Sequence, residues 1–338
     1  MTLLSTGKLP MKLLDRLLSS YELKDKRVIL GPKIGEDAAV IDMGDKYLVA
    51  KTDPITFTAE NIAWYVVNIN ANDIATMGAT PRWFLATVLL PEKKANAKMA
   101  EKLFKELVSA CEALDISLCG GHTEITCGLD RPIIIGNMLG EVEKDKLVDV
   151  GDIEVGDSIV LTKGIAIEAA SIIAREKEKE LADIFGGKFV NGIKKFIYDP
   201  GVSVVKDAMI ACSVADVHAM HDPTEGGLYT GLLELSKAGN VGLVIYKDRI
   251  SLISESKILC EHYNLDIMGA IASGALLIAV DKRDTEKLMT ALQKDNISSE
   301  VIGKVMKKSE GVKIEEKGIL KNLPEFHVDE ITKIYRRM

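Results

Sequence analysis

Four short acidic motifs contain the residues of this sequence that are best suited to chemistry. In chain order they are Gly35-Glu36-Asp37-Ala38-Ala39, Lys51-Thr52-Asp53-Pro54, Asn70-Ala71-Asn72-Asp73 and His221-Asp222-Pro223-Thr224. Three of them adjoin strongly apolar segments that we expect in the core, where a carboxylate without a partner is costly. A hard cation such as Mg²⁺ explains acids in such places, because it takes oxygen ligands from separate loops and carries a phosphate-bearing substrate with it. The motifs therefore predict an ATP-using enzyme without the usual phosphate loop.

Three of the aspartates are expected to meet at one edge of the first half of the chain. Residues 38–42 and 47–51 have the pattern of two strands, separated by a turn at 43–45. If these strands pair as a hairpin, Asp37 and Asp53 lie at the same edge, where two close carboxylates disfavour each other's charge unless a cation lies between them. Residues 61–77 predict a largely apolar, buried helix that stops before Gly78, and Asp73 near its end is the third candidate.

Two glycine-containing motifs are candidate nucleotide contacts. Gly120-Gly121-His122-Thr123-Glu124 follows an apolar strand, so its amides and the Thr123 hydroxyl are expected to approach a nucleotide, while His122 is either catalytic or structural. Asp222-Pro223-Thr224-Glu225-Gly226-Gly227 combines an acid, a hydroxyl and the glycine-rich start of a helix, where free N–H groups favour phosphate. A zinc site at His218 and His221 is the weaker alternative, because this stretch lacks a third ligand.

Composition narrows the class of protein. The chain has 338 residues, 47% of them hydrophobic and 28% charged, which is enough for two soluble domains. Its net charge of −7 and lack of a basic stripe argue against nucleic acid as a main partner. No apolar run approaches the roughly 18 residues needed to span a bilayer, so no membrane partner and a cytoplasmic location are expected. The five cysteines form no CxxC pair and are expected to be reduced thiols.

The order of elements predicts an α+β protein with two domains. We expect an N-terminal α/β domain at residues 1–148 with a mainly antiparallel sheet, and a C-terminal α/β domain at residues 149–338 with a mixed sheet. The boundary is placed in the charged, glycine-marked stretch 140–156. Residues 177–196 are expected to be an exposed, charge-rich excursion. The sequence contains no GxxxxGK[ST], GxGxxG, HExxH or GxSxG motif, which disfavours P-loop, Rossmann, metalloprotease and α/β-hydrolase folds.

Taken together, the motifs resemble those of a known family. Gly-Glu-Asp-Ala-Ala, Thr-Asp, Asn-Asp-Ile-Ala-Thr-Met-Gly-Ala-Thr-Pro, Gly-Gly-His-Thr and Asp-Pro-Thr-Glu-Gly-Gly-Leu occur here in the order and spacing of the AIR synthase, or PurM-like, ATP-dependent superfamily. The chain is most similar to the branch of the hydrogenase maturation protein HypE. The resemblance implies a homodimer whose N-terminal strands pair across the two-fold axis into a barrel, with ATP and Mg²⁺ bound nearby.

The resemblance also implies roles for individual residues. The predicted metal and phosphate acids are Asp37, Asp53, Asp73 and Asp222. The predicted catalytic residues are Asp222, Asp53 and His122, with Asp222 nearest the transferred phosphate. The predicted nucleotide contacts are Gly35, Glu36, Lys51, Thr52, Asn72, Gly120, Gly121, Thr123 and Thr224.

Three functions stay open at this point. The first is activation of an amide-type or similar oxygen by phosphoryl transfer from ATP, with an unidentified acceptor and a possible maturation partner protein. HypE uses a C-terminal cysteine, and this sequence has none after Cys260, so we expect no such reaction on its own tail. The second is a small-molecule kinase resembling thiamine-monophosphate kinase. The third is a nucleotide-binding maturation scaffold without turnover.

Overall fold

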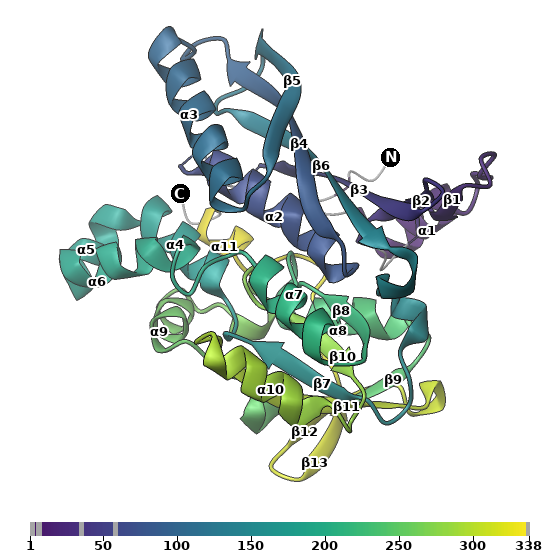
Figure 1. The fold of residues 1–338 in the computed structure, drawn as a ribbon. Coiled ribbons are helices and arrows are strands. Elements are labelled where there is room, and N and C mark those ends of the chain that lie inside the picture. The colour runs from purple at the N-terminus through teal and green to yellow at the C-terminus, as the bar shows by residue number, and fades with distance from the viewer. Residues whose placement is uncertain (1–3, 5–8, 34–36, 57–59, 336–338) are drawn as a thin grey trace. The chain divides into compact units, whose positions relative to one another are not determined.

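The chain folds into two compact units, each built on its own sheet (Figure 1). The computed structural model describes residues 4, 9–33, 37–56 and 60–335. One unit comprises residues 25–31 and 37–147, and the other comprises residues 1–24, 32–36 and 148–338. The predicted two-domain α+β class is therefore confirmed. Among the described residues, no helix combines the length and the apolar character needed to cross a bilayer.

The N-terminal unit is a six-stranded sheet with two helices. Its strand order is β1-β2-β3-β6-β4-β5, and all neighbours are antiparallel except β4 and β5. The elements are β1 (Val28–Leu30), β2 (Ala39–Asp42), β3 (Lys46–Ile55), α2 (Ile62–Thr76), β4 (Thr80–Pro91), α3 (Ala97–Ala113), β5 (Ser117–Thr126), β6 (Ile133–Glu143) and the 3₁₀ turn Lys144–Lys146. The predicted pairing of β2 with β3 is confirmed, with Ala39 opposite Ala50.

Helix α2 supplies the core of this unit. Fourteen of its residues are buried, because it packs against β3, β4, β6 and α3. Strand side chains alternate between two faces, so Phe84, Ile134 and Met138 point toward the helical side and are completely buried. Gly136 also faces α2, and a Cβ atom there would lie 2.4 Å from the Asn70 side chain. Such close packing leaves polar residues of α2 buried, and these residues build the candidate site.

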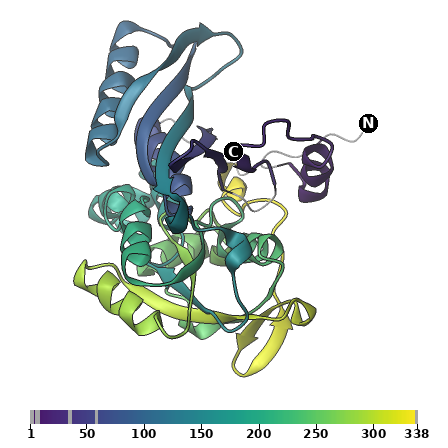
Figure 2. The same cartoon turned by 45° about the vertical axis from the view of Figure 1, so that its right-hand side comes forward.

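The C-terminal unit is a seven-stranded mixed sheet with helices on both faces (Figure 2). Its strand order is β13-β12-β9-β11-β7-β10-β8, and only β12 and β9 are parallel. Helix α8 packs on one face through Leu228, Leu232 and Leu235, while α7 and α10 lie together on the other. The strands are β7 (Ser158–Thr162), β8 (Val217–His221), β9 (Gly242–Tyr246), β10 (Leu277–Val280), β11 (Ser299–Met306), β12 (Val312–Glu316) and β13 (Ile319–Asn322).

The helices of this unit include a second apolar cluster formed by α4, α5, α6, α9 and α11. Most charged side chains of residues 177–196 are exposed, as predicted, but the apolar side chains of this segment pack into the cluster, so the segment is not a loose excursion. Leu181, Val190 and Ile193 are buried, because amphipathic helices α5 and α6 turn their apolar sides toward α4. The helices are α1 (Met11–Leu18), α4 (Ile167–Glu176), α5 (Glu178–Phe185), α6 (Gly187–Lys194), α7 (Val205–Val214), α8 (Gly227–Ala238), α9 (Ser254–His262), α10 (Thr285–Lys294) and α11 (Thr332–Tyr335), with 3₁₀ turns at Val150–Asp152, Lys195–Ile197, Lys247–Arg249, Ile267–Gly269 and Lys308–Glu310.

Candidate metal and nucleotide site

Two of the predicted metal acids meet in the N-terminal unit. Carboxylate oxygens of Asp37, just before β2, and Asp73, on α2, lie within 4.8 Å of each other. Thr76, one turn after Asp73, accompanies them: its hydroxyl donates to Asp73 O at 2.8 Å and contacts Asp37 Oδ2 at 3.4 Å. Asp73 is 4% exposed, so its charge is largely removed from water. Two carboxylates and a hydroxyl form a hard oxygen donor set, which suits Mg²⁺.

Lys51 links the third aspartate to this pair. Its Nζ lies 3.3 Å from Asp73 Oδ1 and 3.7 Å from Asp53 Oδ2. Successive side chains of a strand alternate in direction, so Lys51 and Asp53 on β3 both face α2. The sequence predicted Lys51 as a nucleotide contact, and the structure adds a role as the counter-charge of two acids. Asp53 therefore reaches Asp73 through this lysine rather than through a direct carboxylate pair.

Asn70 holds this arrangement together, although the sequence analysis assigned it no role. Its Oδ1 accepts the backbone N–H of Asp53 at 2.9 Å, and its Nδ2 donates to Asp53 O at 3.2 Å and to Val66 O at 2.8 Å. Asn70 is completely buried, so these bonds join β3 to α2 in one register. A buried amide whose three bonds are all to backbone atoms is a structural clamp. The neighbouring Asn72, a predicted nucleotide contact, is also completely buried.

Thr52, another predicted nucleotide contact, lies between Lys51 and Asp53 on β3. Thr52 is exposed on β3, and its hydroxyl donates to Gly136 O at 2.7 Å. Gly35 and Glu36 lie outside the described residues.

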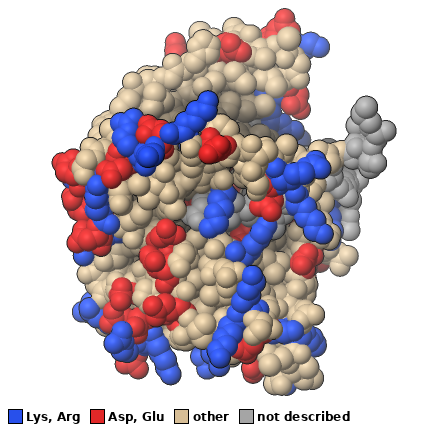
Figure 3. Space-filling view, turned by 90° about the vertical axis from the view of Figure 1, so that its right-hand side faces the viewer, with Lys and Arg blue, Asp and Glu red and all other residues tan. Residues whose placement is uncertain are grey.

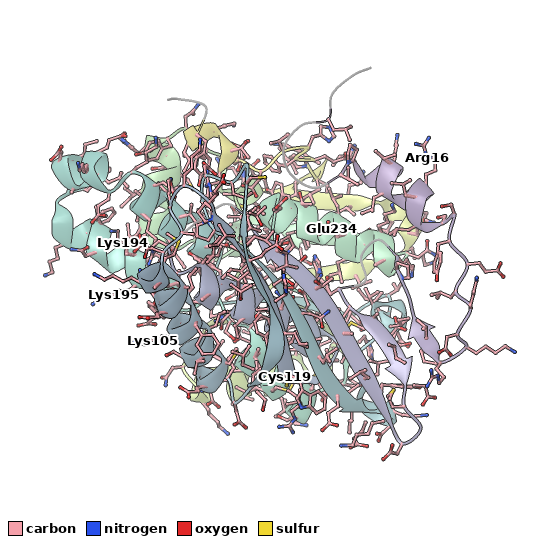
Figure 4. The ribbon with its side chains drawn as sticks, turned by 90° about the horizontal axis from the view of Figure 1, so that it is seen from above. Arg16, Lys105, Cys119, Lys194, Lys195 and Glu234 are labelled. Atoms are coloured by element: carbon pink, nitrogen blue, oxygen red, sulfur yellow. The ribbon has the colours of Figure 1, made fainter. Side chains whose placement is uncertain are left out.

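Gly120, Gly121, His122 and Thr123 are inside strand β5, whereas the sequence predicted that they follow the end of a strand. Strand β5 runs parallel to β4 and is exposed along most of its length; Figure 4 labels Cys119, which precedes the glycine pair. A Cβ atom at Gly121 would lie 1.9 Å from Ala86 O, so glycine here permits the close approach of β5 to β4. His122 Nε2 lies 3.3 Å from Glu124 Oε2, and the imidazole is 68% exposed. Any nucleotide contact by these residues is thus made from an exposed edge strand.

In the C-terminal unit, Asp222 follows strand β8 and is 2% exposed. The two histidines before it are engaged by different acids. His218 Nδ1 lies 2.9 Å from Asp157 Oδ2, and His221 Nε2 lies 3.2 Å from Glu234 Oε2. Figure 4 labels Glu234 on α8. Burial lowers the pKa of His218, but the bond to Asp157 and the charge of Asp216 outweigh that effect and raise it. Separate carboxylate partners give these histidines structural roles and leave the zinc alternative without support.

The first two glycine amides at the start of α8 are already hydrogen-bonded within the chain. Gly226 N–H donates to Asp329 Oδ2 at 2.6 Å, and Gly227 N–H donates to Thr224 O at 3.0 Å. A Cβ atom at Gly227 would lie 2.6 Å from Met268 O, so this glycine allows the helix to pack against residues 268–270. The amides of Gly226 and Gly227 are therefore not among the free N–H groups predicted for this helix start. Asp222 and Thr224 lie in the loop between β8 and α8 and stay predicted site residues. The two glycines instead fix the start of α8 against neighbouring segments.

A buried carboxyl of this unit was not identified from the sequence. Glu168, at the start of α4, is 4% exposed. Burial raises the pKa of Glu168 to about 7; the Ser273 hydroxyl opposes the rise, and the charges of Asp329, Glu225 and Asp222 add to it. A single glutamate in an apolar helix matches no sequence motif. Its burial and its raised pKa become evident only from its neighbours in the folded structure.

Comparison with known proteins assigns the chain to a family. A sequence profile described as AIR synthase related protein, N-terminal domain, matches residues 35–142, and one described as AIR synthase related protein, C-terminal domain, matches residues 154–315. The chain belongs to the AIR synthase related family. The resemblance inferred from the motifs is thereby confirmed.

Relatives within the AIR synthase related family have several activities. A protein of Methanocaldococcus jannaschii assigned to hydrogenase expression/formation is 27% identical over 317 residues, covering 91% of each chain. The thiamine-monophosphate kinase of Buchnera aphidicola is 24% identical over 324 residues, covering 90% of this chain and 93% of the kinase. A crystal structure of E. coli HypE superposes with a TM-score of 0.73 at 21% identity, covering 88% of this chain and 93% of HypE. The relatives include kinases, cyclo-ligases and a dehydratase, which classes this chain as an ATP-dependent enzyme of the superfamily.

Proposed function

We propose that this protein binds Mg·ATP and uses it to phosphorylate an amide-type or similar oxygen, as a member of the HypE-like branch. The observation that carries the proposal is the pairing of Asp37 and Asp73, whose oxygens lie within 4.8 Å of each other beside Thr76. Mg²⁺ held there neutralises phosphate charge, and phosphoryl transfer depends mainly on such positioning and neutralisation. Solved structures of similar fold include a HypE in complex with ATP.

The roles of the other residues belong to the same proposal. Asp222 is assigned as the acid nearest the transferred phosphate, and Asp53 as a further acid whose charge Lys51 moderates before nucleotide binds. Asn72, Thr224 and the described part of the β5 motif are assigned as nucleotide contacts. His122 is assigned to the acceptor side of the reaction, because its imidazole is exposed on strand β5.

We also propose that the active form is a homodimer built on the N-terminal sheet. Helices α2 and α3 pack on one face, and the other face carries the half-buried residues Leu85, Leu89, Ile133, Ile135 and Leu139. Strand β5 is exposed at the edge of the sheet, and Ile125 on it is 64% exposed. An exposed edge beside an apolar face favours pairing with another sheet. Figure 3 shows both acidic and basic side chains on one face of the molecule. A solved structure of similar fold is a HypE-HypF complex, which supports a maturation partner protein for this chain as well.

Product analysis tests the chemistry. Purified protein is incubated with Mg·ATP and candidate carboxamides or phosphorylated acceptors, and ADP, free phosphate and new phosphate esters are measured. Dehydration of an amide yields ADP and free phosphate, as the proposal requires. A new phosphate ester or anhydride would instead support the kinase alternative, which similarity to a thiamine-monophosphate kinase complexed with AMPPCP and TMP favours. Binding without turnover under every condition would support a maturation scaffold.

A further inference from the structure

One carboxylate outside the family-matched region holds the loop that carries Asp222 and Thr224. Asp329 lies beyond residue 315, where the C-terminal family match ends. Its Oδ2 accepts the N–H of Gly226 at 2.6 Å across 103 residues of sequence. Its Oδ1 accepts the N–H of Ile331 at 2.8 Å and of Ile271 at 3.3 Å. A single side chain thus joins three segments: the loop after β8, residues 270–272 and the C-terminal segment.

These bonds are strong because they are charged and shielded. Asp329 is 7% exposed. Burial raises the pKa of Asp329 to about 6, while the bonds from Gly226, Ile331 and Ile271 lower it. Hydrogen bonds from backbone amides to a carboxylate are about twice as strong as neutral ones. The same carboxylate lies beside the first turn of α8, where a negative charge is favoured.

The segment that supplies Asp329 is itself firmly docked. Glu330 accepts the N–H of Asp266 at 2.9 Å and donates its own N–H to Gly269 O at 3.1 Å. Ile331 and Ile334 are buried in the apolar cluster around α4 and α9. The Phe326 ring lies 6.1 Å from that of Tyr229 on α8. The C-terminal segment therefore has anchors besides Asp329, and these anchors provide matched controls.

We propose that Asp329 is a positioning residue for nucleotide binding, which keeps residues 222–227 in the conformation that presents Asp222 and Thr224 to Mg·ATP. The inference rests on the proposed function. It follows that the Gly226 amide binds a carboxylate of the chain itself, so phosphate depends on the metal and on side chains for neutralisation. This differs from sites in which helix N-terminal amides hold the phosphate directly.

Calorimetry with Mg²⁺ and β,γ-methylene-ATP tests the role. In Asp329→Asn, the amide has one oxygen, so an NH₂ group faces either Gly226 N–H or the amides of Ile331 and Ile271. We expect the dissociation constant to rise about tenfold, the loss of roughly one charged hydrogen bond. Hydrogen exchange at Gly226 should accelerate in the same variant. If Asp329→Asn is unfolded at the assay temperature, Asp329→Glu is measured instead, with the same expected direction.

Two controls separate positioning from general stability. Glu330→Gln keeps an acceptor for Asp266 and does not touch Gly226, and Ile334→Ala weakens docking of the segment through its apolar side. Both should bind the analogue within about twofold of wild type. Equal weakening by Ile334→Ala, or unchanged binding in the Asp329 variants, would overturn the positioning role alone. Absence of binding by wild type would overturn the proposed function and this role with it.

Discussion

Lys51 Nζ lies 3.3 Å from Asp73 Oδ1, and this pair neutralises the most buried acid of the N-terminal site. The lysine side chain is 21% exposed and the aspartate side chain 6% exposed, so water screens the pair only partly. A metal ion bound to Asp73 competes with this lysine for the same carboxylate. In the proposed function, the ion pair stabilises the site before nucleotide binds and leaves the lysine available to phosphate afterwards.

Replacing Lys51 should reveal the competition between this lysine and a metal ion for the Asp73 carboxylate. Lys51→Met should lower the free energy of unfolding in EDTA by about 1–3 kcal/mol, because a buried carboxylate loses its counter-charge. Saturating Mg²⁺ should narrow that difference by neutralising Asp73 in its place. Urea denaturation of both proteins, with and without Mg²⁺, measures the effect. Lys46→Met serves as control, since Lys46 pairs with Glu141 and Glu143 at the other end of β3. A difference that Mg²⁺ leaves unchanged would argue against a metal at Asp73.

Asp53→Asn tests the third acid of the N-terminal set. The variant should fold normally and bind Mg·ATP about tenfold more weakly, because one negative charge is lost from the metal and phosphate site. Titration calorimetry gives the dissociation constant. Asp42→Asn on the neighbouring strand removes an acid that pairs with Lys144 at 2.7 Å, and should leave binding unchanged. If Asp53→Asn binds Mg·ATP with the wild-type dissociation constant, Asp53 is not one of the metal and phosphate acids.

Asn70→Ala should disturb the register of β3 on α2. The change leaves the N–H and C=O of Asp53 without their amide partner, and we expect a loss of about 2–3 kcal/mol in the free energy of unfolding. Binding of Mg·ATP should weaken as well, because Asp53 loses its fixed position. Asn68→Ala is the matched control: Asn68 is equally buried in α2, but its Nδ2 donates to Trp64 O within the same helix. Equal effects of the two variants on nucleotide binding would contradict the clamp assigned to Asn70.

The raised pKa of Glu168 should make the free energy of unfolding depend on pH. Its pKa is raised from 4.5 to about 7 in the folded protein, so the folded state holds the proton more tightly than the unfolded state. Its contribution to stability is unfavourable once the unfolded chain ionises above about pH 4.5, and the penalty is complete above about pH 7. Glu168→Gln should remove the penalty and raise the free energy of unfolding by about 3 kcal/mol at pH 8, with little change near pH 4.5. Denaturation in EDTA across this range checks the sign, and parallel curves for both proteins would refute it.

Much of the fold follows from local patterns in the sequence. The hairpin of β2 and β3 appears from alternation and a glycine turn, and its pairing brings Asp37 and Asp53 to one edge. The apolar character of α2, interrupted by Asp73, predicts a buried helix that ends in a functional acid. Recurrence of acids beside core segments predicts metal and phosphate chemistry, because burying a carboxylate without a partner is costly.

Tertiary structure decided what local patterns cannot encode. The pairing of Lys51 with Asp73 and the clamp of Asn70 on Asp53 each require the packing of a helix on a sheet, so spacing alone did not separate Asn70 from Asn72. The Gly120-Gly121 pair was predicted to follow a strand and approach a nucleotide, yet it lies inside edge strand β5, where Gly121 packs closely against Ala86. Asp329 lies 103 residues from the amide it binds, and no periodicity or motif connects such distant positions. Sequence therefore determined the family and predicted metal and phosphate chemistry for the acids, whereas long-range packing decided which groups hold them in place.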